Sequence, residues 1–209
     1  MLTSLTGLDK IFFVVSLILA VPVHEAMHGY MAHWLGDDTA EEAGRLTLNP
    51  LKHVDLYTTI LLPTFMVFLG LPPLMVAKPV PFNPYRVKFG EFGAALVGAA
   101  GPISNILMAI IVAVILRTNL IHFNFNAIQF LLIFIEVNIA LFIINMIPIP
   151  PLDGSRILYA FAPEPLQKLM QRIESFGFTS IIVIFLLIFL VFGQGIYSLE
   201  VHLANLLLG

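Results

Sequence analysis

The residues most capable of chemistry are His24, Glu25 and His28, which lie inside the first apolar stretch of the chain. Residues four positions apart share one face of a helix, so the two imidazoles can bind a single metal ion. Glu25 is then placed to accept a proton from a water molecule that the metal activates. Ionisable groups in so apolar a segment are costly unless they are partnered, so this pattern favours a functional site.

The composition is that of a polytopic membrane protein. Of the 209 residues, 59% are hydrophobic and 11% are charged, whereas a soluble domain carries about 25% charged residues. The net charge of −3 and the absence of a basic run argue against a nucleic-acid partner and leave the lipid bilayer as the expected surroundings. There is no cysteine, so any metal must be bound by His, Asp or Glu.

The elements that must position these residues are apolar helices. The sequence predicts an all-α membrane protein with about four transmembrane helices, a re-entrant or broken hydrophobic segment and short strand-like loops. The predicted spans are Ile11–Leu35, Ala94–Leu116, Ile128 to about Ile147, and Phe178 to about Ile196. Prolines and a glycine interrupt Leu56–Val76, which is the predicted re-entrant segment. Arg45–Leu48 alternates in the manner of a short strand, and an amphipathic surface helix is predicted around Leu166–Ile173.

Charge counting favours four spans over five. With four spans, eight of the ten basic residues share one side and only Lys10 and Arg117 lie opposite, whereas five spans place seven together. The positive-inside rule prefers the first arrangement slightly and makes the basic side cytoplasmic. Geometry is more decisive, because only four spans bring the half of the first helix that holds His28 to the same side as Asp153.

Asp153 is the preferred third metal ligand. A catalytic zinc takes three protein ligands and one water molecule, and the apolar chain offers few candidates besides Glu136 and Asn138. Asp153 follows a proline-broken segment and precedes Gly154, where irregular backbone is tolerated only if it is buried or lines a cavity. Its alternative role is a helix cap. A site with two histidines needs a carboxylate, so we expect a ligand.

Two asparagines are candidates for contact with a reacting group. Asn105 and Asn145 lie near the ends of spans that should face the site, and an uncharged donor is suited to stabilising a developing oxyanion. The alternative for both is hydrogen bonding between helices, which is common for asparagine in membranes.

Three segments carry a resemblance to a known family. They are His24–His28, Gly101–Asn105 and Asn145–Gly154, in this order along the chain. Their patterns H-E-x-x-H, G-P-x-x-N and N-x-x-P-x-x-x-L-D-G are similar to the signature of the site-2 protease family of intramembrane zinc metalloproteases. The chain resembles a minimal prokaryotic member, without a PDZ or a CBS domain.

The resemblance implies a zinc endopeptidase that hydrolyses peptide bonds in or next to transmembrane segments of membrane proteins. It implies one zinc ion bound by His24, His28 and Asp153, with Glu25 as the catalytic base. The expected organisation is a single domain over residues 1–209, with the catalytic core at about 10–156 and a C-terminal helix at about 177–197. The expected location is a prokaryotic inner membrane, with the active site toward the cytoplasm.

Other functions are compatible with the same residues. A metal-ion or proton transporter would also place His, Glu and Asp within spans, although these groups cluster at one depth and do not form a relay. A catalytically silent scaffold is the third reading, and the intact catalytic positions argue against it. For the protease, Arg45–Leu48 and Val76–Phe82 are candidates to hold an unwound substrate as an added strand.

Overall fold

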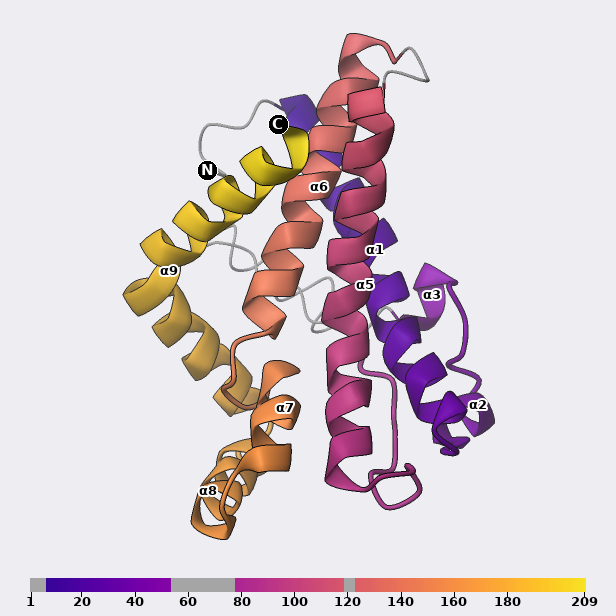
Figure 1. The fold of residues 1–209 in the computed structure, drawn as a ribbon, viewed down its shortest axis with the longest axis vertical. Coiled ribbons are helices and arrows are strands. Elements are labelled where there is room, and N and C mark those ends of the chain that lie inside the picture. Colours follow the sequence, from indigo (N-terminus) through magenta and orange to yellow (C-terminus); the bar gives the residue numbers. More distant parts are fainter. Residues whose placement is uncertain (1–6, 54–77, 119–122) are drawn as a thin grey trace.

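The computed structural model describes residues 7–53, 78–118 and 123–209, and in these ranges it contains helices and no strand. Figure 1 shows their arrangement. The helices are α1 (Gly7–Trp34), α2 (Thr39–Glu42), α3 (Pro50–His53), α5 (Glu91–Thr118), α6 (Phe125–Asn145), α7 (Gly154–Phe161), α8 (Glu164–Ser175) and α9 (Phe178–Leu208).

Four helices are long and apolar enough to cross a membrane. They are α1, α5, α6 and the Val183–Leu208 part of α9. The prediction of an all-helical, multi-pass membrane protein is therefore confirmed. The predicted re-entrant segment, Leu56–Val76, lies outside the described residues, and its path stays a prediction.

Two local predictions are wrong. Arg45–Leu48 is not a strand, because the Arg45 amide donates to the Ala40 carbonyl and the Thr47 amide donates to the Arg45 carbonyl, as in a turn. The C-terminal helix does not end near residue 197 but continues to Leu208. Its last turns are held in place because Leu203, Ala204 and Leu207 pack onto a cluster formed by α5 and α6.

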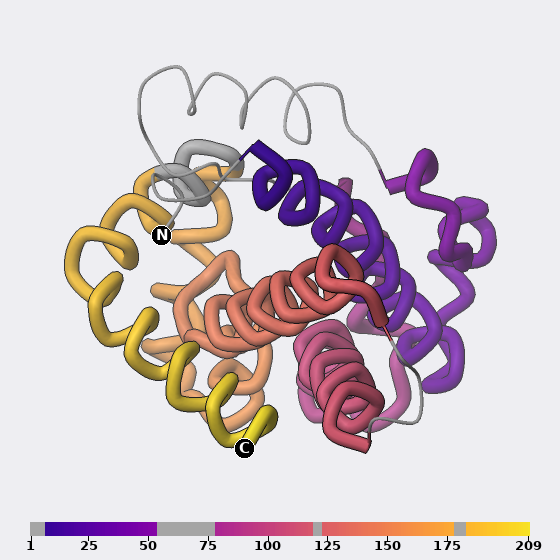
Figure 2. Tube along the Cα trace, turned by 90° about the horizontal axis from the view of Figure 1, so that it is seen from above, coloured from indigo at the N-terminus to yellow at the C-terminus, as the bar shows by residue number. Residues whose placement is uncertain are grey.

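The helix α6 lies at the centre of the bundle. Seen from above, it has α1 and α5 on one side and α9 on the other (Figure 2). Ile135, Ile139 and Ile143 of α6 pack against Ala109 and Ala113 of α5. Small residues on one helix allow a close approach by branched residues on the next, which is how membrane helices gain packing energy.

The directions of the long helices bring the motif residues of α1 and those that follow α6 to the same end of the bundle. In Figure 1, α1 descends, α5 ascends and α6 descends, which places the connections after α1 and after α6 at the lower end, together with α7 and α8. Eight of the ten basic residues lie in the stretch between α1 and α5, in α7 or in α8. They are Arg45, Lys52, Lys78, Arg86, Lys88, Arg156, Lys168 and Arg172.

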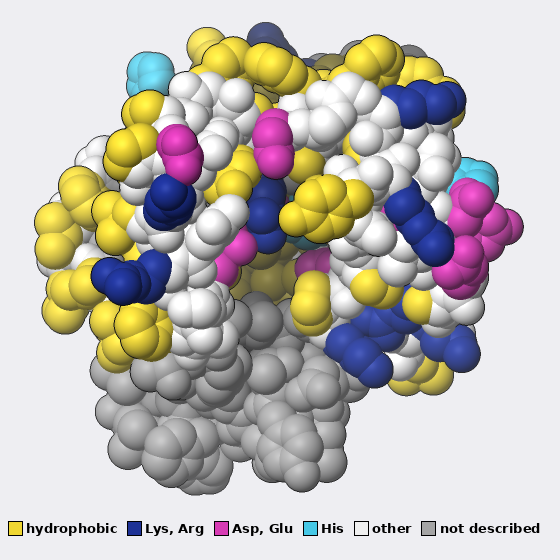
Figure 3. Space-filling view, turned by 90° about the horizontal axis from the view of Figure 1, so that it is seen from below, with side chains coloured by type: hydrophobic (Ala, Val, Ile, Leu, Met, Phe, Trp, Pro, Cys, Tyr) yellow, Lys and Arg dark blue, Asp and Glu magenta, His cyan; other side chains and the backbone are white. Residues whose placement is uncertain are grey.

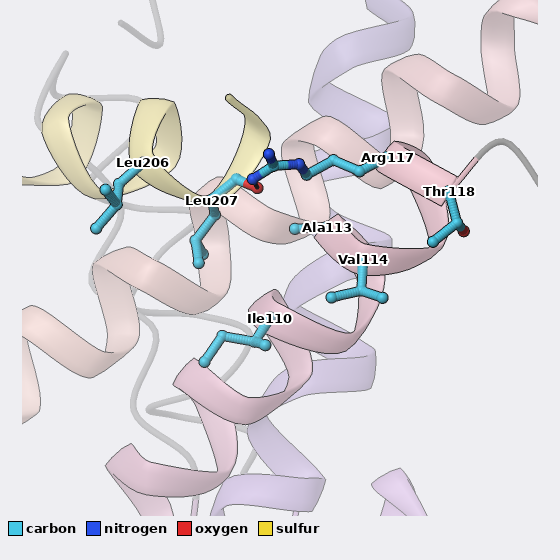
Figure 4. Close-up of a pocket in the computed structure, with 7 residues that line it drawn as sticks. All are labelled: Ile110, Ala113, Val114, Arg117, Thr118, Leu206 and Leu207. Atoms are coloured by element: carbon cyan, nitrogen blue, oxygen red, sulfur yellow. Dashed lines mark hydrogen bonds between the residues drawn. The ribbon is translucent and has the colours of Figure 1, made fainter.

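The upper end carries an apolar groove. A cavity of about 300 Å³ lies between the last turns of α5 and the end of α9, where Arg117 donates to the Leu207 carbonyl (Figure 4). The part of α5 that lines it begins at Ile110, nine residues above Gly101, or roughly 14 Å along the helix. This groove is therefore separate from the part of α5 that carries Gly101 and Asn105.

Candidate metal centre

Three side chains from distant parts of the sequence converge at the lower end of the bundle. The Nε2 atoms of His24 and His28 lie 3.1 Å apart. The Asp153 Oδ2 atom lies 3.0 Å from the first and 3.4 Å from the second. Both histidines are buried, at 7% and 9% exposed. The fold thus brings together residues that the sequence predicted as a group: His24 and His28 from α1, and Asp153, which precedes α7.

Each imidazole has its other nitrogen bound to a hydrogen-bond acceptor. His24 Nδ1 lies 2.5 Å from the side-chain oxygen of Asn105, and His28 Nδ1 lies 2.7 Å from the Val97 carbonyl. An oxygen acceptor at Nδ1 requires the proton to be on that nitrogen, which leaves Nε2 with a lone pair in the neutral ring. Both Nε2 lone pairs are therefore available at the point where the rings meet Asp153.

The orientation of the Asn105 amide follows from a chain of hydrogen bonds. Its Nδ2 donates to the side-chain oxygen of Asn138 at 2.9 Å, and the Asn138 Nδ2 donates to the Phe134 carbonyl at 2.8 Å. Asn105 and Asn138 are fully buried. This series of hydrogen bonds directs the Asn105 oxygen toward His24, so α5 and α6 together set the tautomer of a histidine on α1.

The donor set fits a zinc ion. In the neutral rings, the Nε2 lone pairs of His24 and His28 converge with the Asp153 carboxylate oxygen. A cation can bind all three of these electron-pair donors. Two imidazoles with one carboxylate form a known ligand set for catalytic zinc, which leaves a fourth position for water or substrate. The residues present therefore fit the metal that the sequence motif predicted.

Gly101 keeps the centre of the cluster open. A Cβ atom at this position of α5 would lie 2.4 Å from His28 Nε2 and 2.7 Å from His24 Nε2. No side chain fits there without displacing both imidazoles. Gly101 lies inside a helix and has an ordinary helical backbone, so its conformation does not require glycine. What requires glycine is the close approach of the two imidazoles.

Asp153 reaches the histidines because α7 lies close to α5. A Cβ atom at Gly98 would meet the Asp153 carbonyl at 3.0 Å and Arg156 Cβ at 2.8 Å, so the glycine allows this contact. Asp153 occupies the N-cap position of α7, but its side chain makes no capping hydrogen bond. The carboxylate faces His24 and His28, and the alternative role as a helix cap is not what the geometry shows.

The cluster is accessible from the lower face. The Asp153 side chain is 24% exposed, in contrast to the buried imidazoles. Figure 3 shows this face hollowed near its centre, with acidic, basic and hydrophobic side chains around the hollow. Arg156 of α7, three residues after Asp153, has its guanidinium carbon 6.0 Å from the Phe82 ring centroid and its Nη2 atom 3.3 Å from a Glu174 oxygen. Water can therefore approach from the end of the molecule that carries most of the basic residues.

Glu25 is held by a main-chain donor that sequence reasoning missed. The Val80 amide donates to Glu25 Oε2 at 2.9 Å. The prolines at 79 and 81 indicate an extended segment, and the structure shows residues 78–82 without helix or strand, while Val76 and Ala77 lie outside the described residues. No sequence signal identified which side chain this segment would contact.

The two asparagine predictions have different outcomes in the geometry. Asn105 lies next to the cluster, but it binds His24 and Asn138. The Asn145 amide donates to the Leu141 carbonyl of its own helix at 3.0 Å. Direct contact of either residue with a substrate stays a prediction.

Comparison with known proteins finds zinc metalloproteases among the relatives of this chain. Residues 118–191 match the model of peptidase family M50. The chain is 38% identical over 181 residues to a Bacillus subtilis protein named "Putative zinc metalloprotease YwhC", covering 83% of this chain and 80% of the relative. It is 27% identical over 172 residues to "Putative zinc metalloprotease Rip2" of Mycolicibacterium smegmatis, covering 80% of this chain and 63% of the relative. No solved structure was found to match.

The chain belongs to peptidase family M50, a family of zinc metalloproteases. It is an integral membrane member, because four of its helices are long and apolar enough to span a bilayer. Its substrates are accordingly proteins. The predictions that the chain is a zinc metalloprotease and that it resembles this family are confirmed.

Proposed function

We propose that this protein is an intramembrane zinc endopeptidase that hydrolyses peptide bonds in or next to transmembrane segments of other proteins. The observation that carries the proposal is the convergence of Asp153 Oδ2 with His24 Nε2 and His28 Nε2, which belong to the candidate membrane span α1. Because each Nδ1 atom faces an oxygen acceptor, the neutral rings present their Nε2 lone pairs to this point, which suits metal ligands.

The ligands would hold one zinc ion, and each other group has a defined task. Zinc bound there would supply a Lewis acid that polarises a carbonyl and lowers the pKa of water to about 7. Glu25 Oε1 would take a proton from the water molecule as it adds to the scissile carbonyl. As the carbon–nitrogen bond breaks, Glu25 would pass that proton to the leaving amine. The Val80 amide holds Oε2 in the meantime.

The substrate must present an unwound segment to this site. Amides in a transmembrane helix are already paired, so a scissile bond becomes accessible only where that helix is opened. Asn145 is our candidate donor to the scissile carbonyl oxygen, since Asn105 is engaged by His24 and Asn138. The extended residues 78–82 are our candidate for pairing with the substrate main chain.

We place the site on the cytoplasmic side of a bacterial inner membrane. Eight of the ten basic residues lie in the stretch between α1 and α5, in α7 or in α8, and the positive-inside rule assigns these connections to the cytoplasm. The two named relatives are bacterial proteins.

The test is a Glu25→Gln variant of the full chain, compared with wild type and with His24→Ala. Glu25→Gln should keep about one zinc per chain and lose cleavage of a transmembrane reporter protein, because only the proton acceptor is removed. His24→Ala should lose both zinc and cleavage. A Glu25→Gln protein that still cleaves the reporter, or a wild type without zinc, would reject the peptidase. A transporter that uses the same cluster would show metal or proton flux and no cleavage by wild type.

A further inference from the structure

The segment formed by residues 78–83, which we call the strap, passes along the face of α1 that carries Glu25. It contains Pro79 and Pro81 and has no regular secondary structure. The buried Val80 donates its amide to Glu25 Oε2 at 2.9 Å. The position of the carboxylate therefore depends on the position of a single peptide group, the one that joins Pro79 to Val80.

Arg45 binds the strap at the opposite edge of that peptide group. Its Nη2 donates to the Lys78 carbonyl at 2.7 Å and to the Pro79 carbonyl at 3.3 Å, while Nη1 donates to the Lys52 carbonyl. Arg45 is 8% exposed. A buried guanidinium is expensive unless its donors are satisfied, so this residue is committed to holding main-chain carbonyls.

The peptide group is thus bound by a cation on one side and an anion on the other. In a trans peptide the C=O and N–H point in opposite directions, so Arg45 binds the oxygen and Glu25 accepts from the amide hydrogen. Both hydrogen bonds involve a charged partner and polarise the peptide in the same sense, which makes each stronger. Loss of the guanidinium would loosen the contact that orients the carboxylate.

Gly29 explains how the strap comes so close to α1. Gly29 lies four residues after Glu25 and shares its helical face. A Cβ atom there would lie 2.7 Å from Leu46 Cδ2 and 3.0 Å from Val80 Cγ1. The residue that follows Arg45 and the residue that binds Glu25 thus both fit against the same glycine.

The far end of the strap is fixed independently. Asp37, which is fully buried, accepts from the Asn83 amide at 2.5 Å and from the Thr39 amide at 3.1 Å. With this end fixed by Asp37, the end of the strap that carries Val80 is held by Arg45 and by the Lys78 amide, which donates to the His53 carbonyl at 2.9 Å.

We propose that Arg45 is a positioning residue for Glu25, acting through the Pro79–Val80 peptide group. It holds this group so that the Val80 amide fixes Oε2 and leaves Oε1 to transfer the proton. The inference rests on the proposed function in one respect, namely that Glu25 is the base. The structural link from Arg45 to Val80 is independent of catalysis.

The test uses the purified full chain with Arg45→Met, Arg45→Lys and Arg86→Met. Arg86→Met is the matched control, because it removes an exposed guanidinium on the same side of the protein, whose partner is Glu42. Zinc content, amide hydrogen exchange at Val80, and kcat and KM on a transmembrane reporter are measured for each.

Arg45→Met should keep its zinc, exchange the Val80 amide about tenfold faster, and lose about 10–100-fold in kcat. The loss should fall on kcat more than on KM, because the strap keeps its Asp37 contact and stays available to the substrate main chain. Arg45→Lys should recover part of the kcat by donating to the Pro79 carbonyl, and Arg86→Met should match wild type. Wild-type kcat or unchanged Val80 exchange in zinc-loaded Arg45→Met would overturn the proposal.

A second variant covers the case in which Arg45→Met does not fold. Val80→Pro removes the amide donor, together with the branched side chain near Gly29, in a segment that already contains Pro79 and Pro81, and it should lower kcat to a similar extent. Adding Arg45→Lys to it should cost little more, since two residues that act through one contact are not additive. Wild-type kcat in Val80→Pro, or fully additive losses, would overturn the proposal.

These outcomes are distinguishable from failure of the proposed function. If Glu25 were not the base, Glu25→Gln would still cleave the reporter, whatever the behaviour of Arg45. If only the inference about Arg45 failed, Glu25→Gln would be inactive with zinc bound, and Arg45→Met would retain wild-type kcat.

Discussion

The Nδ1 atom of His24 lies 2.5 Å from the side-chain oxygen of Asn105. Through this contact, α5 fixes the ring orientation of a metal-ligand candidate on α1. Asn138 of α6 in turn holds the Asn105 amide, so three helices determine where His24 Nε2 points. Such supporting hydrogen bonds raise the basicity of a ligand and reduce the entropy it loses when a metal binds.

Replacing Asn105 with leucine should weaken zinc binding by about 10–100-fold while the helices remain intact. The volume is similar, but His24 Nδ1–H would lose its acceptor. Zinc affinity is measured by competition with a chelator. The exposed Asn126 of α6 supplies the control, and Asn126→Leu should bind zinc as wild type does. Equal affinities for the two variants would show that Asn105 does not support His24.

Gly101→Ala should abolish zinc binding. The added methyl group would lie between His24 and His28, at less than 3 Å from both Nε2 atoms. Helix content by circular dichroism should be retained, because alanine is a good helix former. The matched control is Gly195→Ala in α9, where a Cβ atom meets nothing within 4 Å. Zinc bound at wild-type stoichiometry in Gly101→Ala would contradict the assigned position of the metal.

Asn145→Ala should retain zinc and lose about 10–100-fold in kcat if this amide contacts the scissile carbonyl oxygen. In the structure the amide donates to the Leu141 carbonyl, so it must turn away from its own helix to reach a substrate. Zinc analysis and reporter cleavage on the same preparation separate the two effects. A wild-type kcat would leave Asn145 with a structural role only.

Asp37 should make stability depend on pH. Burial alone would raise the pKa of this carboxyl, but hydrogen bonds from Thr39 and Asn83 outweigh it and hold the pKa below its ordinary value. A depressed pKa means that the ionised form stabilises the fold above about pH 4, and that this stabilisation is lost as the pH falls through the folded pKa.

Asp37→Asn should therefore lower the apparent melting temperature at pH 7, and the difference from wild type should shrink below about pH 4. Circular dichroism of the detergent-solubilised protein provides the measurement. Glu164→Gln, at an exposed carboxyl paired with Lys168, is the control and should show no comparable difference. A gap between wild type and Asp37→Asn that does not change with pH would indicate that the ionised carboxyl contributes nothing.

The sequence predicted the elements of this protein well, because hydrophobic runs of this length are compatible with few structures. A transmembrane helix satisfies its own main-chain hydrogen bonds, so its existence can be inferred without knowing its neighbours. The predicted strand at Arg45–Leu48 was wrong for the opposite reason. Alternation over a few residues does not reveal whether a partner strand exists, and here the side chain of Arg45 binds the main-chain carbonyls of Lys52 and of the distant Lys78 and Pro79.

The sequence by itself determined the membrane class, the two histidines with their glutamate, and the carboxylate expected to join them, since each depends on residue type and local spacing. The tertiary structure decided the contacts among them. The tautomers of His24 and His28 depend on acceptors in α5, the space between their rings depends on Gly101, and the placement of Glu25 depends on the Val80 amide. These are contacts between segments far apart in the chain, and local periodicity contains no information about them.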